Sequence, residues 1–201
     1  MKYRSEAAPL KLLALVTLFC LGAPAFAHVS ATHGVHGFEA GFLHPLLGVD
    51  HLLAMLAIGI WAAQHKGKAF WILPLVFPLA MMAGAWLGIQ GVQIPGVEGG
   101  IAVSVLILGL LIAAAIKLPL LISAVLVSLF ALAHGYAHGI EIAAGASAIW
   151  FVVGFVFSTA LLHASGLLAA LSVNRFLSEK MNRVAGAAIA MTGLFFVAAL
   201  T

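Results

Sequence analysis

Two short motifs combine histidines with carboxylates within otherwise apolar sequence. The first is His44-x5-Asp50-His51, and the second is His134-x3-His138-x2-Glu141. On a helix of about 3.6 residues per turn, the three polar groups of the second motif share one stripe. Neutral imidazole nitrogens together with carboxylates suit divalent transition-metal ions. The sequence therefore predicts one metal-ion site, whose ligands are His44, Asp50, His51, His134, His138 and Glu141.

The first motif needs a local change of chain direction to act as one site. If His44 and His51 were on one helix, they would lie two turns apart, too far along the axis to share an ion. Pro45 suits the first position of a helix, where its missing N–H costs nothing. We therefore predict that the helix begins at Pro45 and that His44 belongs to the preceding loop, from which it folds back toward Asp50 and His51.

The composition indicates what kind of element carries these motifs. Hydrophobic residues make up 64% of the 201 residues and charged residues only 7%, which excludes a soluble domain. The formal charge of +3 comes from so few groups that no nucleic-acid partner is expected. Apolar runs near the length that crosses a bilayer, about 20 residues, are interrupted by Gly, Pro or charged residues. They lie at about 45–64, 69–90, 100–116, 118–138, 145–172 and 184–200, so we predict an all-α polytopic membrane protein with a six-helix bundle.

The N-terminal segment has the pattern of a cleaved signal peptide. Basic residues precede an apolar run of 11 residues, Leu12 to Gly22, and Ala25-Phe26-Ala27 offers small residues at the cleavage positions. A first membrane span is the weaker alternative because this run is too short. We predict a signal peptide at 1–27 and a transmembrane domain at 28–201. The single cysteine, Cys20, would be removed, which leaves no thiol ligand.

The basic residues predict the orientation. With residue 28 delivered to the periplasm, all of the remaining basic residues fall in loops predicted to be cytoplasmic, as the positive-inside rule requires. They are Lys66, Lys68, Lys117, Arg175, Lys180 and Arg183. Both mature termini would be periplasmic, in a bacterial inner membrane. Counted from Lys66 and Lys117, His51 and His134 lie at similar depths, roughly 22 to 26 Å outward, so the two motifs can form one cluster if the first and fourth spans are neighbours.

An isolated histidine near the interface would more simply snorkel or satisfy a helix end. That interpretation explains the whole set poorly, because an aspartate within a span costs ~2.5 to 3.5 kcal/mol on insertion scales. The other histidines leave alternatives open. His28, His33 and His36 could gather metal ions outside the membrane or form a solvated leader, and His163 could be a further ligand along a path or a packing residue. His65, beside Lys66 and Lys68, is expected to be solvated.

The motifs resemble a known family. His-x5-Asp-His on the first mature span and His-Gly-x-Ala-His-Gly-x-Glu on the fourth are similar to the signatures of the HupE/UreJ family of nickel permeases, and the resemblance covers the whole chain plan. It implies that the six motif residues are critical for transport and that the protein is associated with nickel supply to hydrogenases and ureases. One departure is Ala133, where the family usually has Phe; Phe130 lies one turn earlier.

The predicted function is a permease that moves a divalent transition-metal ion from periplasm to cytoplasm. The choice of Ni²⁺ rests on the resemblance, because the ligands alone suit Co²⁺ or Zn²⁺ as well. No permanently bound cofactor is expected, and the partners are the metal ion and the lipid bilayer. The main alternative is an intramembrane zinc-dependent hydrolase, whose Zn²⁺ would keep an open water position. A metal-sensing or assembly subunit without transport is a third possibility.

Overall fold

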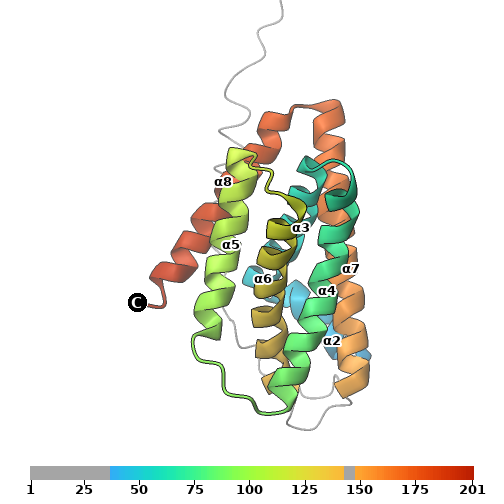
Figure 1. Ribbon diagram of the computed structural model, residues 1–201, viewed down its shortest axis with the longest axis vertical. Helices are drawn as coiled ribbons and strands as arrows, with labels where there is room; N and C mark the ends of the chain where they lie inside the picture. The colour runs from blue at the N-terminus through green and yellow to red at the C-terminus, as the bar shows by residue number, and fades with distance from the viewer. Residues whose placement is uncertain (1–36, 143–147) are drawn as a thin grey trace, which may run out of the picture.

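The computed structural model describes residues 37–142 and 148–201, except for the side chain of Glu141. This part of the chain contains helices and no strand, which confirms the all-α class. The helices are α2 (Phe38–Leu47), α3 (Val49–Gln64), α4 (Lys68–Ile89), α5 (Val97–Ala114), α6 (Leu120–Ile142), α7 (Ala148–Phe176) and α8 (Glu179–Ala198). The predicted signal peptide at 1–27 lies outside the described residues. Figure 1 shows α3 to α7 running side by side, with α8 tilted away at one edge.

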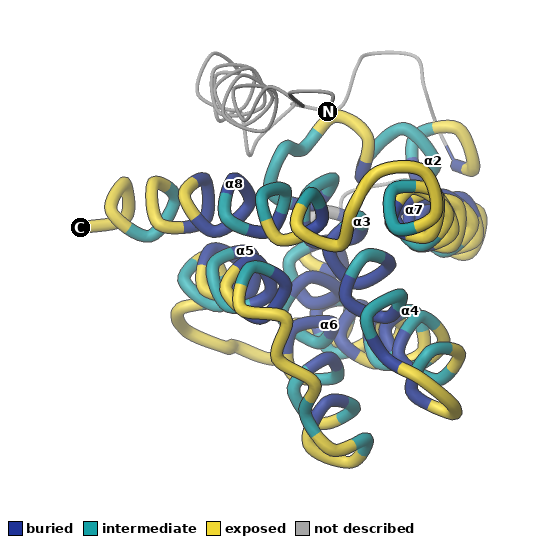
Figure 2. Tube along the Cα trace, turned by 90° about the horizontal axis from the view of Figure 1, so that it is seen from above, coloured by how far each residue is buried: buried dark blue, intermediate teal, exposed yellow. Residues whose placement is uncertain are grey.

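The helices are apolar on their outer faces, as lipid contact requires. On α4, Trp71 and Leu75 are exposed, whereas Leu73 and Phe77 are fully buried. Figure 2 shows buried residues gathered where α3, α4 and α6 meet. Helices α4 to α8 are each long and apolar enough to cross a membrane, and α2 with α3 can form a sixth, broken span. The chain is therefore a multi-pass membrane protein.

The first predicted span differs from the expectation. Pro45 does not begin the helix: it lies inside α2 together with His44, and the break falls at Gly48, which adopts an extended conformation with φ −86° and ψ 116°. Pro45 removes a helical hydrogen bond, and glycine is a poor helix former, so together they weaken the ladder at this point. The arms α2 and α3 are bent by 84°. The predicted change of direction is present, but it lies after His44 and not before it.

Closely packed glycines hold α4 against α6. A Cβ added at Gly135 would overlap the carbonyl oxygen of Met81, and one at Gly139 would overlap that of Ala85. In return, Gly84 and Gly88 lie against carbonyl oxygens of α6. These Gly-x3-Gly spacings let the backbones of α4 and α6 approach closely.

The same device joins other helices. Gly59 of α3 and Gly166 of α7 each lie against a backbone carbonyl of the opposing helix, as do Gly41 of α2 and Gly154 of α7. Helix α5 packs on α8 through Gly109, Gly186 and Gly193. The helices thus form three closely packed groups: α4 with α6, α5 with α8, and α7 with α2 and α3.

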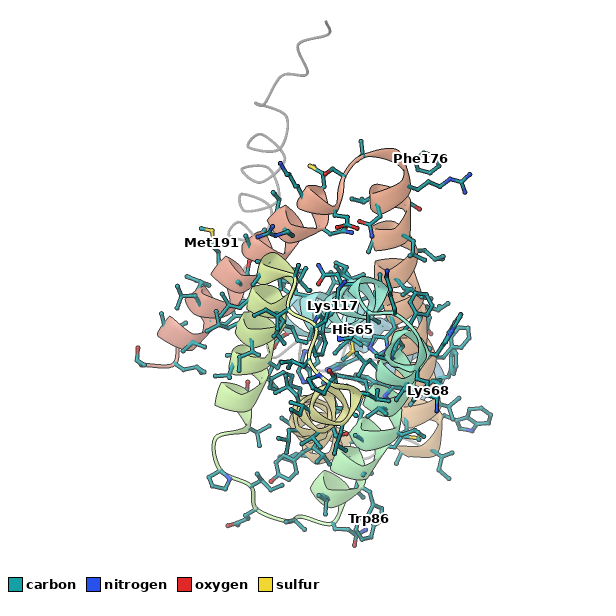
Figure 3. The ribbon with its side chains drawn as sticks, turned by 45° about the horizontal axis from the view of Figure 1, so that its top comes forward. His65, Lys68, Trp86, Lys117, Phe176 and Met191 are labelled. Carbon is teal, nitrogen blue, oxygen red and sulfur yellow. The ribbon has the colours of Figure 1, made fainter. Side chains whose placement is uncertain are left out.

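The connections between α3 and α4, α5 and α6, and α7 and α8 lie together at the upper end of Figure 1, and the basic residues lie in these connections or in the adjoining helix ends. At this end, a cavity of about 140 Å³ is lined by residues that include His65 and Lys117 (Figure 3).

The expectation that His65 is solvated was wrong. It is only 7% exposed, its ring packs on Trp61 with a centroid distance of 4.8 Å, and its Nδ1 donates to the Trp61 carbonyl oxygen at 2.9 Å. The carbonyls of the last turn of α3 lack helical donors, and one of them accepts a hydrogen bond from the His65 ring.

Candidate metal centre

Histidines of α2, α3 and α6 gather in the interior. The ring centroids of His44 and His138 are 4.4 Å apart, those of His51 and His138 are 4.4 Å apart, and those of His51 and His134 are 5.0 Å apart. The bend at Gly48 also brings the rings of His44 and His51 to 6.0 Å. The structure thus brings the two sequence motifs together into one histidine cluster, defined here as His44, His51, His134 and His138.

Three members of the histidine cluster are buried beside aromatic side chains, and His44 is half-buried. His134 is fully buried, His138 is 3% exposed and His51 is 7% exposed. The ring of Phe155 packs on that of His138 at 4.4 Å, and the ring of Phe77 lies 5.8 Å from that of His134. An apolar surround of this kind strengthens any electrostatic interaction within it, because the effective dielectric is low.

Asp50 fixes the orientation of His51. Its Oδ1 accepts a hydrogen bond from the His51 backbone N–H and another from His51 Nδ1, both at 2.8 Å. A Cβ at Gly48 would lie 3.0 Å from both Asp50 Oδ1 and His51 Nδ1, so the glycine that breaks the helix also leaves room for this pair. Because Nδ1 is the donor, Nε2 of a neutral His51 carries the free lone pair.

His134 shows the same arrangement with a different acceptor. Its Nδ1 donates to the carbonyl oxygen of Phe130 at 2.8 Å, one turn earlier on α6. The Nε2 atoms of His51 and His134 are both buried, and neither has a hydrogen-bond partner among the described residues. Metal-ligating histidines usually donate their second nitrogen to a carboxylate or a backbone carbonyl in this way, which leaves the other nitrogen for the metal.

The remaining predicted ligands are placed as follows. Glu141 lies on α6, one turn beyond His138, but its side chain is outside the described part of the chain. His28, His33 and His36 also lie outside the described residues. Within 37–142 and 148–201, no three His, Cys, Asp or Glu side chains are arranged to hold an ion as they stand. The cluster is therefore a packed set of rings, and the role of these residues as ligands stays a prediction.

The sequence did not indicate the aromatic residues around the histidine cluster or the backbone carbonyl that bonds His163. Phe77 lies between the histidine cluster and His163, whose ring is 5.2 Å away from that of Phe77. Nδ1 of His163 donates to the carbonyl oxygen of Pro74 at 3.1 Å. The available signal was Pro78, four residues after Pro74, because a proline within a helix leaves that carbonyl without its usual donor.

The fold and the buried cluster define a multi-pass α-helical membrane protein with an imidazole-lined interior. The family model described as HupE / UreJ protein matches residues 15–196. Protein HupE of Rhizobium leguminosarum bv. viciae is 42% identical over 178 residues, which cover 88% of this chain and 93% of that relative. The chain belongs to the HupE/UreJ family. No solved structure matches it.

Proposed function

We propose that this chain is a permease that carries a divalent transition-metal ion, with Ni²⁺ as the expected cargo, from the periplasm to the cytoplasm across the bacterial inner membrane. His44, Asp50, His51, His134, His138 and Glu141 are the proposed ligands. Membership of the HupE/UreJ family supports transport and supports nickel. The same nitrogen and oxygen donors would accept Co²⁺ or Zn²⁺, so the residues alone do not select among these ions.

The observation that carries the proposal is the pair of buried Nε2 atoms on facing helices. A buried polar atom without a partner costs about 1 to 3 kcal/mol. His51 and His134 each carry one, and their ring centroids are 5.0 Å apart, so the two atoms call for a common explanation. A cation that visits both lone pairs provides it. The rings would turn to converge on the ion, and passage requires that binding be weak enough for release.

The distribution of basic residues supports the proposed orientation in the membrane. The loop residues Lys66 and Lys117 and the last-turn residue Arg175 of α7 lie at the end that the positive-inside rule assigns to the cytoplasm. The histidine cluster is then nearer the periplasm, and both mature termini are periplasmic. The segment with His28, His33 and His36 would meet the ion first and raise its local concentration.

Uptake of radiolabelled nickel by cells that express the chain tests the proposal. We expect the wild type to accumulate nickel and the double variant His134→Ala, His138→Ala to lose at least about tenfold, because two ligands are removed. The control is Leu129→Ala on the same helix, whose side chain is 59% exposed on the outer face and should not affect uptake. A double variant that matches the wild type would discard the site.

The metal content of the purified protein separates transport from the zinc-hydrolase alternative. A carrier binds its cargo reversibly, so protein purified without added metal should contain far less than one ion per chain. A resident enzyme metal would survive purification. One zinc ion per purified wild-type chain, together with no more nickel in cells that express the chain than in cells that lack it, would contradict the proposed permease function.

A further inference from the structure

His163 of α7 is a buried histidine outside the histidine cluster, and it is 2% exposed. The ring of Phe77 lies 5.8 Å from that of His134 and 5.2 Å from that of His163. Phe77 therefore packs near both rings and lies between the histidine cluster and His163. Counted along the helices, His163 is roughly 18 Å from Arg175, whereas His134 is roughly 25 Å from Lys117, so His163 lies closer to the basic end.

A defect in α4 holds His163 in place. Pro78 has no backbone N–H, so the carbonyl of Pro74, four residues earlier, loses its helical donor. A buried carbonyl needs a partner, and His163 Nδ1 supplies it at 3.1 Å. The backbone of His163 is also fixed, because Gly59 of α3 lies directly against its carbonyl oxygen.

This hydrogen bond determines which nitrogen of His163 is available. A carbonyl oxygen can only accept, so Nδ1 carries the proton and a neutral ring presents the Nε2 lone pair. Nε2 is buried and has no hydrogen-bond partner in the part of the chain that the structure describes, and the same holds for Ser158 Oγ, five residues earlier on α7. His163 thus repeats the arrangement of His51 and His134: one nitrogen is used for orientation and the other is left as an acceptor.

We propose that His163 is a second ligand on the ion's path, which receives the divalent cation after it leaves the histidine cluster. Pro78 is a positioning residue for this step, because it frees the carbonyl that orients the imidazole. The inference rests on the proposed transport function. The two prolines of α4 have different roles. Pro74 provides the carbonyl oxygen that accepts from His163, and Pro78 lacks the backbone N–H that would otherwise occupy that oxygen.

The test measures the initial rate of nickel uptake against nickel concentration for His163→Ala and Pro78→Ala. Pro78→Ala restores an N–H that returns the residue-74 carbonyl to the helix. We expect each variant to lower the maximal rate about tenfold, with a KM within about twofold of the wild type because the outer ligands are intact. Pro74→Ala keeps its carbonyl and should lose less than Pro78→Ala. Leu79→Ala, 61% exposed beside Pro78, should match the wild type.

The double variant separates positioning from a general effect on folding. If both residues act through one hydrogen bond, Pro78→Ala adds no further loss to His163→Ala. Losses that multiply, or a wild-type rate for His163→Ala, would overturn the inference. If His163→Ala does not reach the membrane, Pro78→Ala against Pro74→Ala decides, since neither removes a core side chain. A wild type that accumulates no nickel would instead reject the proposed function.

Discussion

Asp50 is the carboxylate that the structure shows acting directly on a histidine of the cluster. Its Oδ1 receives both the backbone N–H and the Nδ1 proton of His51. Without this acceptor, the imidazole of His51 could rotate or carry its proton on Nε2, and the lone pair would be lost to the cluster. In the proposed site, the carboxylate would also supply negative charge to offset the cation.

Two substitutions separate these contributions. Asp50→Ala removes both the acceptor and the charge, so nickel uptake should fall about 10- to 100-fold. Asp50→Asn keeps an oxygen that can accept a hydrogen bond from His51. Its nickel uptake should lie between that of Asp50→Ala and that of the wild type. Uptake rates at equal protein level give the order. An Asp50→Ala variant as active as the wild type would mean that orientation of His51 is not needed.

At the scale of elements, the contact between α4 and α6 depends on glycine. A methyl group at Gly135 would overlap the Met81 carbonyl oxygen, which is backbone and cannot move aside. We expect Gly135→Ala to lower the free energy of unfolding in detergent by about 1 to 3 kcal/mol. Gly99 on α5 is the control, because a Cβ there meets no other described atom within 4 Å. Gly99→Ala should leave stability unchanged or raise it by up to about 1 kcal/mol; equal losses in both variants would contradict the packing argument.

The sequence predicts the helices better than it predicts their partners. Apolar runs locate α4 to α8 to within a few residues, because membrane spans are set by length and hydropathy. The helix break was misplaced because Pro45 favours a first-turn position locally, whereas the chain stops the helix at Gly48. Hydropathy also does not say which helices touch.

The same limit applies to individual side chains. The histidine cluster could be expected from matched depth, which is a local count along each span. The burial of His65 and the hydrogen bond of His163 could not, because both depend on a particular carbonyl oxygen, and the second lies on another helix. Pro78 lies within an apolar run of the sequence, but the partner that its helix leaves to the Pro74 carbonyl depends on the packing of α7.

For the whole molecule, the gathering of basic loops gives a testable orientation. Val92 lies between α4 and α5, and Leu177 lies between α7 and α8; both are exposed. With Cys20 replaced by Ala, we expect an impermeant maleimide to label Val92→Cys in intact spheroplasts and Leu177→Cys only after the membrane is broken. The opposite pattern would reverse the topology.

Glycine packing also limits how the interior can open. His44 and His51 belong to the group of α2, α3 and α7, whereas His134 and His138 belong to that of α4 and α6. Within each group, backbones touch and leave no room to slide. Relative motion between the two groups would separate the imidazoles of α2 and α3 from those of α6. The hydrogen bond from His163 Nδ1 to the Pro74 carbonyl oxygen joins the two groups, so their separation would break it.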